Sequence, residues 1–374
     1  MKYVNRRESI RLANQFISKR FSVRDISFEE IILRNYLISL HWENMEENVR
    51  GNYLNENLLL AKREIEERSR NQTWDVKSLC GMGHSLHCVQ NKLHCLNKMT
   101  VSYQAYALSW IRSYIRQVER FSSQGDIDLS YESGVCCAIR YMLCEEAFFQ
   151  DAILRLTELF LDLFAIQSEK KDLNFGMRYG WNGYLWTLNQ FRKKYLDCGN
   201  VKKAVCDMVR IFLEKRRFDK DLSFWPAIIS ANGKEVHNIS DSWSYGSTMT
   251  LMNLQESVEL FEIPEQGFLD ELKMRCNLCV GDLCFTDAGH DTGYAGALRL
   301  FETAFRKYRL PCFGYMKECL AEELLREHTT DGVYSFFKYN VADGNLKKES
   351  DVGRDAVRES YMIYIVLLFA GYVE

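Results

Sequence analysis

The sequence predicts an all-α protein in which about six helix pairs close into a double ring, an α/α toroid. Three observations predict this fold class. The 374 residues include only 3 prolines, and proline interrupts the interior of helices. Apolar residues at helical spacing run through most of the chain, and no convincing alternating strand pattern occurs. A glycine-headed apolar helix also recurs along the sequence, as is typical of stacked helix pairs.

The recurring unit is a glycine that directly precedes an apolar segment of helical spacing. Its copies follow one another at intervals of roughly fifty to sixty residues, which suits one inner and one outer helix per unit. The copies are headed by Gly81 with Gly83, Gly134, Gly180 with Gly183, Gly246, Gly293 with Gly296, and Gly353. Because no pair buries its apolar face alone, the pairs must stack, and a closed ring gathers the glycine-rich helix starts at one end.

Second helices are expected between these units, over residues 101–121, 150–164, 201–218 and 313–328. Residues 361–373 predict a buried helix, because this apolar run is too short to span a bilayer. Residues 331–340 suit a short strand or hairpin. We expect a single domain over residues 1–374, with residues 1–75 forming N-terminal helices that lead into the ring.

Composition excludes several classes of protein. The net charge is −3 without a long run of one sign, so nothing indicates a nucleic-acid interface. The N-terminus has no apolar signal core, and no stretch approaches the ~20 apolar residues of a transmembrane helix. These features predict a cytoplasmic protein, whose 13 cysteines are expected to be reduced thiols.

One segment is a candidate for a functional site, namely residues 289–308, GHDTGYAGALRLFETAFRKY. Small residues and the pair His290–Asp291 precede an amphipathic helix. A glycine-rich helix start allows another helix or a ligand to approach closely. The two interpretations are helix packing and a site built where inner helices begin.

The pattern resembles the lanthionine synthetase C-like proteins, the cyclases of lanthipeptide maturation, from about residue 75 to the C-terminus. In that family, inner helices are headed by G-x-x-H-G-x-x-G, W-C-Y-G-x-P-G and C-H-G-x-A-G. This chain has GMRYGWNG at 176–183, WSYGSTM at 243–249 and DTGYAG at 291–296, in the same order. The resemblance implies an α/α toroid that adds cysteine thiols of a precursor peptide to dehydroalanine or dehydrobutyrine, forming thioether rings. It also implies a leader and core peptide as partner, with a dehydratase and an exporter as further partners.

The chain departs from the family at the catalytic positions. The family's two cysteines and one histidine that bind zinc correspond here to Ser244, Asp291 and Thr292. The family's active-site histidine corresponds to Tyr179, and its catalytic aspartate falls near Ser130, two residues from Asp128. Hydroxyls are poor zinc ligands and one carboxylate does not hold the ion, so we expect no zinc and no other cofactor.

Cyclisation without zinc remains chemically possible, and some multidomain lanthipeptide synthetases of the family also lack the zinc ligands. Forming a thiolate at pH 7 costs about 2 kcal/mol, which a nearby base can offset. The candidate catalytic residues are His290 as general base, Arg178 or Tyr179 as stabilisers of the enolate, and Asp291. The open alternative for His290 is a helix-cap or surface histidine, and we expect Asp291 and Ser244 to be N-caps. Candidate peptide contacts are the aromatic residues Trp181, Trp243, Tyr245 and Tyr294.

Two cysteine-containing segments are weaker candidates for chemistry. Helical spacing places Cys80, His84, His87 and Cys88 on one face, where a displaced metal site is conceivable. The same segment suits an inner helix, in which cysteine packs as a small hydrophobic residue. Cys276, Cys279 and Cys284 fall on an expected outer helix, for which simple packing is the preferred interpretation.

Three functions remain open from the sequence. The first is a zinc-independent thioether cyclase. The second is a catalytically degenerate relative that binds the precursor peptide or scaffolds a dehydratase and exporter. The third is a toroid binding module unrelated to peptide maturation. Toroids of this shape also occur in glycan-processing enzymes, but the sequence offers no well-placed carboxylate pair beyond Asp241 and Asp291.

Overall fold

The computed structural model is mostly helical and divides into two compact units. The terminal unit comprises Met1–Gln72, Ser240–Trp243 and Cys276–Glu374, and the central unit comprises Thr73–Ile239 and Ser244–Arg275. The structure describes residues 6–21, 23, 26–45, 47–91, 97–122, 127–168, 172–196, 199–237, 241–264, 266–278, 288–291, 293–326, 334, 337–342, 345–350 and 355–371.

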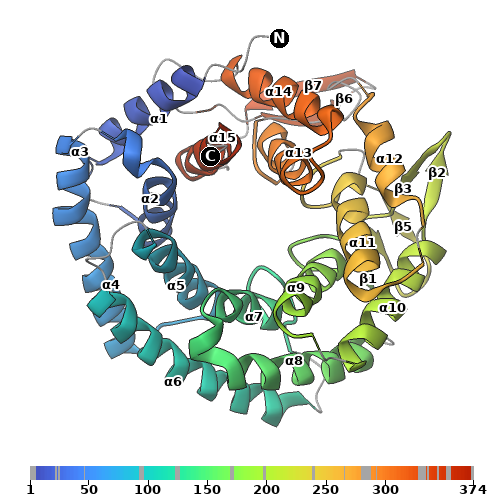
Figure 1. Cartoon of the computed structure of the whole chain (residues 1–374), viewed down its shortest axis with the longest axis horizontal. Coiled ribbons are helices and arrows are strands. Elements are labelled where there is room, and N and C mark those ends of the chain that lie inside the picture. Colours follow the sequence, from blue (N-terminus) through green and yellow to red (C-terminus); the bar gives the residue numbers. More distant parts are fainter. Residues whose placement is uncertain are drawn as a thin grey trace. The chain divides into compact units, whose positions relative to one another are not determined.

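The central unit consists of two layers of helices that alternate along the chain (Figure 1). The first layer contains α5 (Val76–Gln90), α7 (Val135–Cys144), α9 (Trp181–Lys194) and α11 (Ser247–Phe261), each packed on the next. The second layer contains α6 (Asn97–Phe121), α8 (Glu146–Ser168), α10 (Gly199–Glu214) and α12 (Phe268–Arg275). These helices confirm the alternating pairs that the sequence predicts, and α7, α9 and α11 each follow a predicted glycine. As a correction, Gly81 and Gly83 do not head a helix but lie inside α5, which already begins at Val76 because Asp75 caps it.

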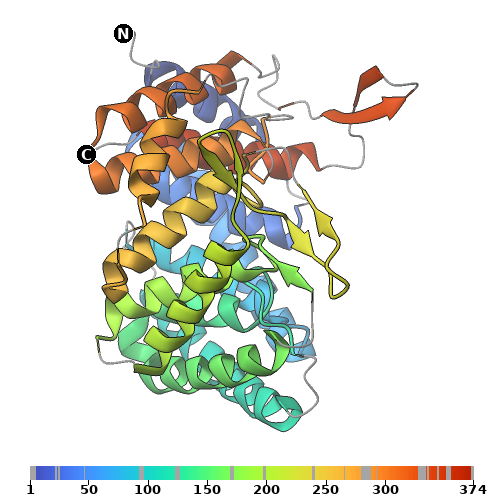
Figure 2. The same cartoon turned by 90° about the vertical axis from the view of Figure 1, so that its right-hand side faces the viewer.

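Short antiparallel strands accompany these helices and were not expected from the sequence (Figure 2). They are β1 (Leu173–Asn174), β2 (Arg217–Asp219), β3 (Leu222–Phe224), β4 (Ile228–Ile229) and β5 (Glu235–Val236). β1, β4 and β5 form one sheet, while β2 and β3 form another. As a correction, α10 ends at Glu214 rather than continuing to residue 218, and the chain turns into β2.

The terminal unit joins helices from both ends of the chain. It contains α1 (Arg6–Phe21), α2 (Phe28–His41), η1 (Trp42–Asn44), α3 (Glu47–Asn52), η2 (Tyr53–Asn57) and α4 (Leu58–Asn71). It also contains α13 (Tyr294–Tyr308), α14 (Pro311–Arg326), β6 (Phe337–Ala342), β7 (Asn345–Ser350) and α15 (Ala356–Gly371). α15 is the expected C-terminal helix and packs on α1, α2 and α13. The β6–β7 hairpin includes part of the segment expected to form a strand or hairpin.

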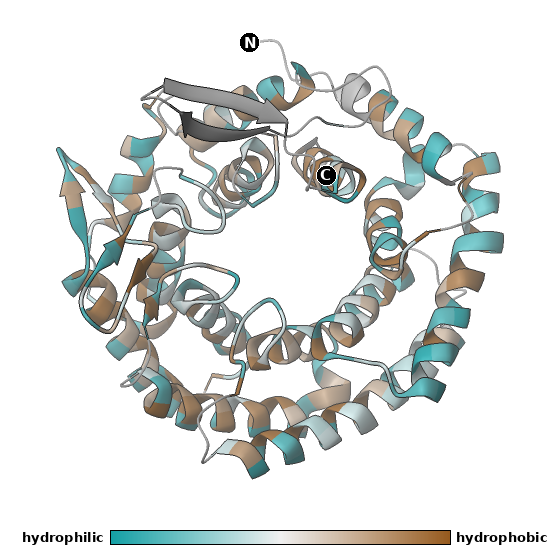
Figure 3. Ribbon diagram, turned by 180° about the vertical axis from the view of Figure 1, so that it is seen from behind, coloured by the Kyte–Doolittle hydropathy of each residue, from teal (hydrophilic) through white to brown (hydrophobic). Residues whose placement is uncertain are grey.

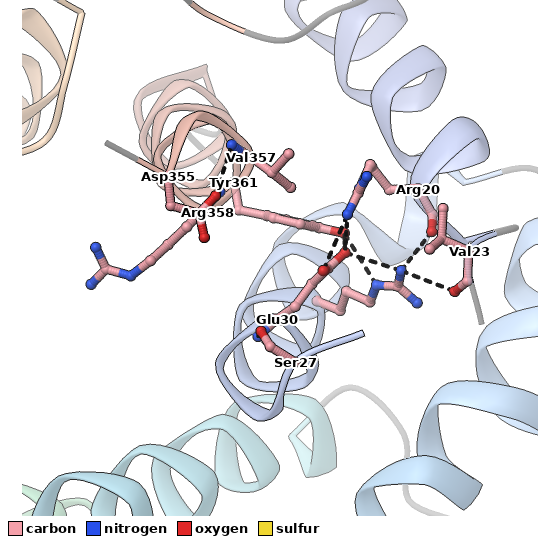
Figure 4. Close-up of polar contacts among 9 residues, drawn as sticks. Arg20, Val23, Ser27, Glu30, Asp355, Val357, Arg358 and Tyr361 are labelled. Carbon is pink, nitrogen blue, oxygen red and sulfur yellow. Dashed lines mark hydrogen bonds and ion pairs between the residues drawn. The ribbon is translucent and has the colours of Figure 1, made fainter. Parts of the chain in front are cut away.

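A partly buried ionic cluster ties α15 to the N-terminal helices of this unit (Figure 4). Oε1 of Glu30 accepts hydrogen bonds from Nη2 of Arg20 at 3.0 Å, Nη2 of Arg34 at 3.1 Å and the hydroxyl of Tyr361 at 3.0 Å. Nε of Arg34 donates to the same hydroxyl at 3.1 Å. Burial raises the pKa of Tyr361 to about 12, so its phenol stays protonated. The N-terminal helices are therefore integral to the unit that contains the C-terminal helix.

Apolar burial and internal polar contacts hold the helix layers together. Hydrophobic and hydrophilic residues mix along most helices, as expected for amphipathic segments (Figure 3). Between α9 and α11, Asn182 donates to the Thr250 hydroxyl at 2.8 Å, and Asn189 donates to the carbonyl of Asn253 at 3.1 Å. These buried hydrogen bonds fix the register of the two helices. No described helix is long and apolar enough to cross a membrane.

Candidate functional site

Glycines form the N-caps of four successive repeat helices. Gly134, Gly180, Gly246 and Gly293 cap α7, α9, α11 and α13, and none of these caps has a side-chain hydrogen bond. The expectation that Asp291 and Ser244 are N-caps is therefore wrong, because each lies two residues before the capping glycine. The preceding turn is instead closed by backbone bonds, such as Gly293 N–H to the carbonyl of Gly289 at 3.1 Å.

The second glycine of two repeats is required by close backbone approach. A Cβ on Gly296 would clash with the carbonyl oxygen of His290, and a Cβ on Gly183 would clash with that of Met177. Both carbonyls belong to the turn that precedes the same helix. Close backbone packing between each helix and its preceding turn thus accounts for these glycines, and a ligand is not needed to explain the glycine at position 296.

In the terminal unit, His290 lies in the turn before α13 with both ring nitrogens paired. Nδ1 lies 3.3 Å from Oδ1 of Asp291, and Nε2 lies 3.1 Å from Nη1 of Arg299. Because a guanidinium only donates, Nε2 must accept, which places the proton of the neutral ring on Nδ1, facing the carboxylate. The ring also packs against Trp243 at a centroid distance of 4.8 Å, and His290 is 4% exposed. The structure therefore brings together the predicted residues His290, Asp291 and Trp243, and adds Arg299.

In the central unit, hydrogen bonds link the turns before three successive helices. The Glu132 N–H donates to the carbonyl of Arg178 at 3.1 Å, and the Met177 N–H donates to the carbonyl of Ser244 at 2.7 Å. The ring of Tyr245 packs against Gly176. The turns that carry Arg178, Ser244 and Tyr245 are thus held side by side by their backbones.

A charged cluster surrounds Glu132 in the same unit. Oε1 of Glu132 lies 2.9 Å from Nζ of Lys77, and Oε2 lies 3.9 Å from Nε of Arg178. Burial opposes ionisation of Glu132, but the positive charges of Arg178, Lys77 and Arg140 lower its pKa below the ordinary value. The cluster holds the predicted residue Arg178 beside a carboxylate that stays ionised at neutral pH.

Tyr179 and Trp181 line a pocket of about 210 Å³ in the central unit. Tyr179 is 51% exposed, whereas Trp181 is 5% exposed and packs on Phe164. Asp128 lies at the same pocket, where its carboxylate accepts from the Ser130 N–H and from the Ser133 hydroxyl, both at 2.8 Å. The pocket therefore combines two sequence-predicted residues with the carboxylate that lies near the family's aspartate position.

The remaining predicted residues are placed as follows. Tyr294 is the first residue of α13 and is half-buried. Thr292 lies outside the described residues, as do Cys279, Cys284 and Gly353. Cys276 follows the last residue of α12, so the helix expected over all three cysteines ends before the first of them. The central unit contains Arg178, Tyr179, Trp181, Ser244 and Tyr245, whereas the terminal unit contains Trp243, His290, Asp291 and Tyr294.

α5, which carries Cys80, His84, His87 and Cys88, packs on α7. His87 pairs through Nδ1 with Oε1 of Glu145 at 2.6 Å. Burial raises the pKa of Cys80, and burial with nearby acidic groups raises the pKa of Cys88 to about 12. Both thiols thus favour the protonated form, as expected for cysteines that pack as small hydrophobic residues. Among the described residues, no group of three or more histidines, cysteines and acids is arranged to hold a metal ion.

The family's zinc does not fit the donor set of this chain. Of the aligned residues that the structure describes, Ser244 offers a hydroxyl, and Asp291 directs Oδ1 to His290. Zinc sites use three or four cysteine, histidine or carboxylate ligands, and a serine hydroxyl does not replace a thiolate. The side chains present therefore give no support for zinc chemistry, and the absence of zinc stays a prediction.

The helix layers and the helix-start turns define the class of protein, a repeat of helix pairs with polar residues at the helix starts. The family model for lanthionine synthetase C-like protein matches residues 45–341, and the chain belongs to this family. Among solved structures, the chain is similar to nisin cyclase, with a TM-score of 0.70 and 15% sequence identity over 96% of this chain and 97% of that chain. This likeness confirms the all-α α/α toroid fold class. No curated protein matches the sequence.

Sequence reasoning missed Arg299, Glu132 and Lys77. Arg299 lies on α13 nine residues after His290, and its helical position alone does not reveal which side chain it contacts. Glu132 lies two residues before the capping Gly134, and Arg178 lies two residues before the capping Gly180 of the next repeat, so the two residues occupy equivalent turn positions. Comparing equivalent turn positions between repeats is the signal that could have found Glu132.

Proposed function

We propose that this protein matures a lanthipeptide by adding cysteine thiols of a dehydrated precursor to dehydroalanine or dehydrobutyrine, without zinc. Family membership and the toroid fold support a cyclase-type function. The single observation that supports a reaction without zinc is the Asp291–His290 pair in the turn before α13. Nδ1 of the ring lies 3.3 Å from Oδ1 of the Asp291 carboxylate. A carboxylate on Nδ1 fixes the imidazole orientation and leaves the basic lone pair on Nε2.

In this proposal, the cysteine S–H transfers its proton to Nε2 of His290. The thiolate forms a C–S bond with the β-carbon of the dehydro residue, and the electron pair of the double bond moves into an enolate. The imidazolium then returns its proton to the α-carbon, so no external oxidant or reductant is needed. Because Arg299 donates to Nε2, the substrate thiol must displace that contact at 3.1 Å before His290 can act.

Arg178 and Tyr179 retain the role that the sequence assigns to them, stabilisation of the enolate. Fixed cationic or hydroxyl donors stabilise such developing charge. The ion pair with Glu132 at 3.9 Å and the backbone hydrogen bond between the two residues keep Arg178 close to this carboxylate. The expected partners remain the precursor peptide, a dehydratase and an exporter, and the expected location remains the cytoplasm.

One observation favours the second candidate function, a catalytically degenerate protein that binds the precursor or scaffolds its partners. His290 is 4% exposed, and both of its ring nitrogens are engaged. A histidine in this state stabilises its turn without any chemical role. The single-domain organisation over residues 1–374 also stays a proposal.

Replacement of His290 distinguishes the two candidates. We expect His290→Gln and His290→Ala to lower the rate of thiol loss on a dehydrated precursor by ~10²–10⁴-fold, with the fold unchanged. His237→Gln is the matched control, because that side chain is 45% exposed and its ion pair with Glu235 lies in the central unit. Activity of His290→Gln within about threefold of the parent removes His290 from the mechanism. A parent that binds precursor but consumes no thiols establishes the second candidate.

A further inference from the structure

The pocket beside α8 has features that neither the proposed proton transfer nor the toroid fold requires. It lies at the C-terminal end of α8, between the segment 127–129, β1 and the start of α9, and has a volume of about 210 Å³. Pockets for drug-sized ligands are usually about 300–1,000 Å³. The space therefore suits one amino-acid side chain better than a larger cofactor.

Aromatic rings form the walls of this pocket. Four aromatic residues line it, namely Phe164, Tyr179, Trp181 and Tyr184. The ring of Phe164 contacts Trp181 at 5.0 Å and Tyr184 at 6.0 Å between centroids, both edge to face. These contacts fix the inner rings, whereas Tyr179 is 51% exposed and lies at the mouth. Such rings offer negative faces to a cation.

Two carboxylates add negative charge to the described lining of the pocket. Asp128 and Asp172 line it, and the described lining residues include no lysine, arginine or histidine. Asp128 accepts from the Ser130 N–H and the Ser133 hydroxyl, and Oδ1 of Asp172 accepts from the Ala231 N–H at 2.8 Å. Each carboxylate offers about four acceptor sites, so these contacts position the groups and leave acceptor capacity toward the pocket.

We propose that this pocket binds the side-chain ammonium or guanidinium group of a lysine or arginine in the precursor peptide, an inference that rests on the proposed function. The alkyl stem of such a side chain lies against the rings, while its charged end meets the carboxylates. A neutral chain of the same length gains the ring contacts but not the charge. The pocket thus selects peptides with a cationic residue at one position.

Binding of small probes tests this selection directly. We expect N-acetyl-lysine amide to bind the full-length protein in a nuclear magnetic resonance titration. N-acetyl-norleucine amide, which has the same stem without the charge, should bind at least about fivefold more weakly. The affinity for the lysine probe should also fall as salt rises, because exposed charges are screened.

Asp172→Asn removes one charge while its amide oxygen still accepts from the Ala231 N–H. We expect it to raise the Kd of the lysine probe about two- to fivefold, and Tyr179→Ala to act similarly. Asp151→Asn is the matched control, because Asp151 is exposed on α8 at about 20 Å along the helix from Phe164. Equal binding of the two probes, no binding of the lysine probe, or equal effects of Asp172→Asn and Asp151→Asn would overturn the proposal.

These measurements need no turnover, so they separate the pocket from the proposed reaction. A parent that binds the lysine probe but consumes no precursor thiols contradicts the cyclase function and leaves the pocket in place. A parent that consumes thiols but does not discriminate between the probes supports the cyclase function and overturns the pocket assignment.

Discussion

Alanine at Gly296 should destabilise the protein, whereas alanine at Gly51 should stabilise it. At Gly296, a new Cβ would clash with the His290 carbonyl and lie 2.9 Å from Cβ of Trp243. The carbonyl is backbone in the turn before α13, so relief requires the turn and the Trp243–His290 contact to move. Overpacking of this kind costs about 1–3 kcal/mol. At Gly51, nothing lies within 4 Å of the new Cβ, and alanine gains about 0.5–1 kcal/mol in a helix.

Thermal and urea unfolding of the two single variants measure this contrast. A chain of this size changes its Tm by on the order of 1 °C per kcal/mol, so Gly296→Ala should melt about 1–4 °C lower. Gly51→Ala should melt at the parent temperature or slightly above it. If Gly296→Ala is as stable as the parent, the close approach at the start of α13 does not explain this glycine, and the packing argument fails.

Two further predictions concern buried charged and titratable groups. Burial lowers the pKa of His41 from 6.5 to about 4. Between these two pH values the unfolded chain binds more protons than the folded protein, so the free energy of unfolding should fall as the pH falls, by up to about 3 kcal/mol. His41→Gln should flatten the dependence in urea unfolding between pH 7 and 4.5, and an unchanged slope would show that another group is responsible. Glu302 is 0% exposed and pairs with Arg306 at 2.6 Å and with Lys317 at 2.7 Å. Glu302→Ala should lower the free energy of unfolding by about 3–5 kcal/mol, because it leaves Lys317 buried without its partner. The double change Glu302→Leu with Lys317→Met should cost less in the same assay, and an equal or larger loss would contradict the reasoning.

The repeat made the helices predictable, because glycine followed by an apolar helical stripe is a long and periodic signal. The strands between residues 173 and 236 were not predictable in this way. Each contains only two or three residues, so period-two alternation has no length in which to appear. The end of α10 at Glu214 was missed because Phe218 of β2 lies seven residues after Ile211 and so continues the helical spacing.

The candidate site was predictable as a set of positions but not as a set of contacts. His290 and Asp291 are adjacent in sequence, and their pairing is local. The contact of Arg299 with His290, and that of Glu132 with Arg178, depends on how turns and helices pack. The N-cap expectation for Asp291 failed because backbone bonds and Gly293 already complete the helix start. The α5 face was predicted correctly as a helical surface, but packing turns His87 toward Glu145.

Thiol consumption by metal-free protein shows whether cyclisation is independent of zinc. The parent protein is treated with a chelator, checked for zinc by elemental analysis, and incubated with a dehydrated precursor while free thiols and ring formation are followed by mass spectrometry. We expect thioether rings to form at the same rate before and after chelation, and added zinc not to increase this rate. Ring formation that is lost on chelation and restored by stoichiometric zinc would contradict this expectation.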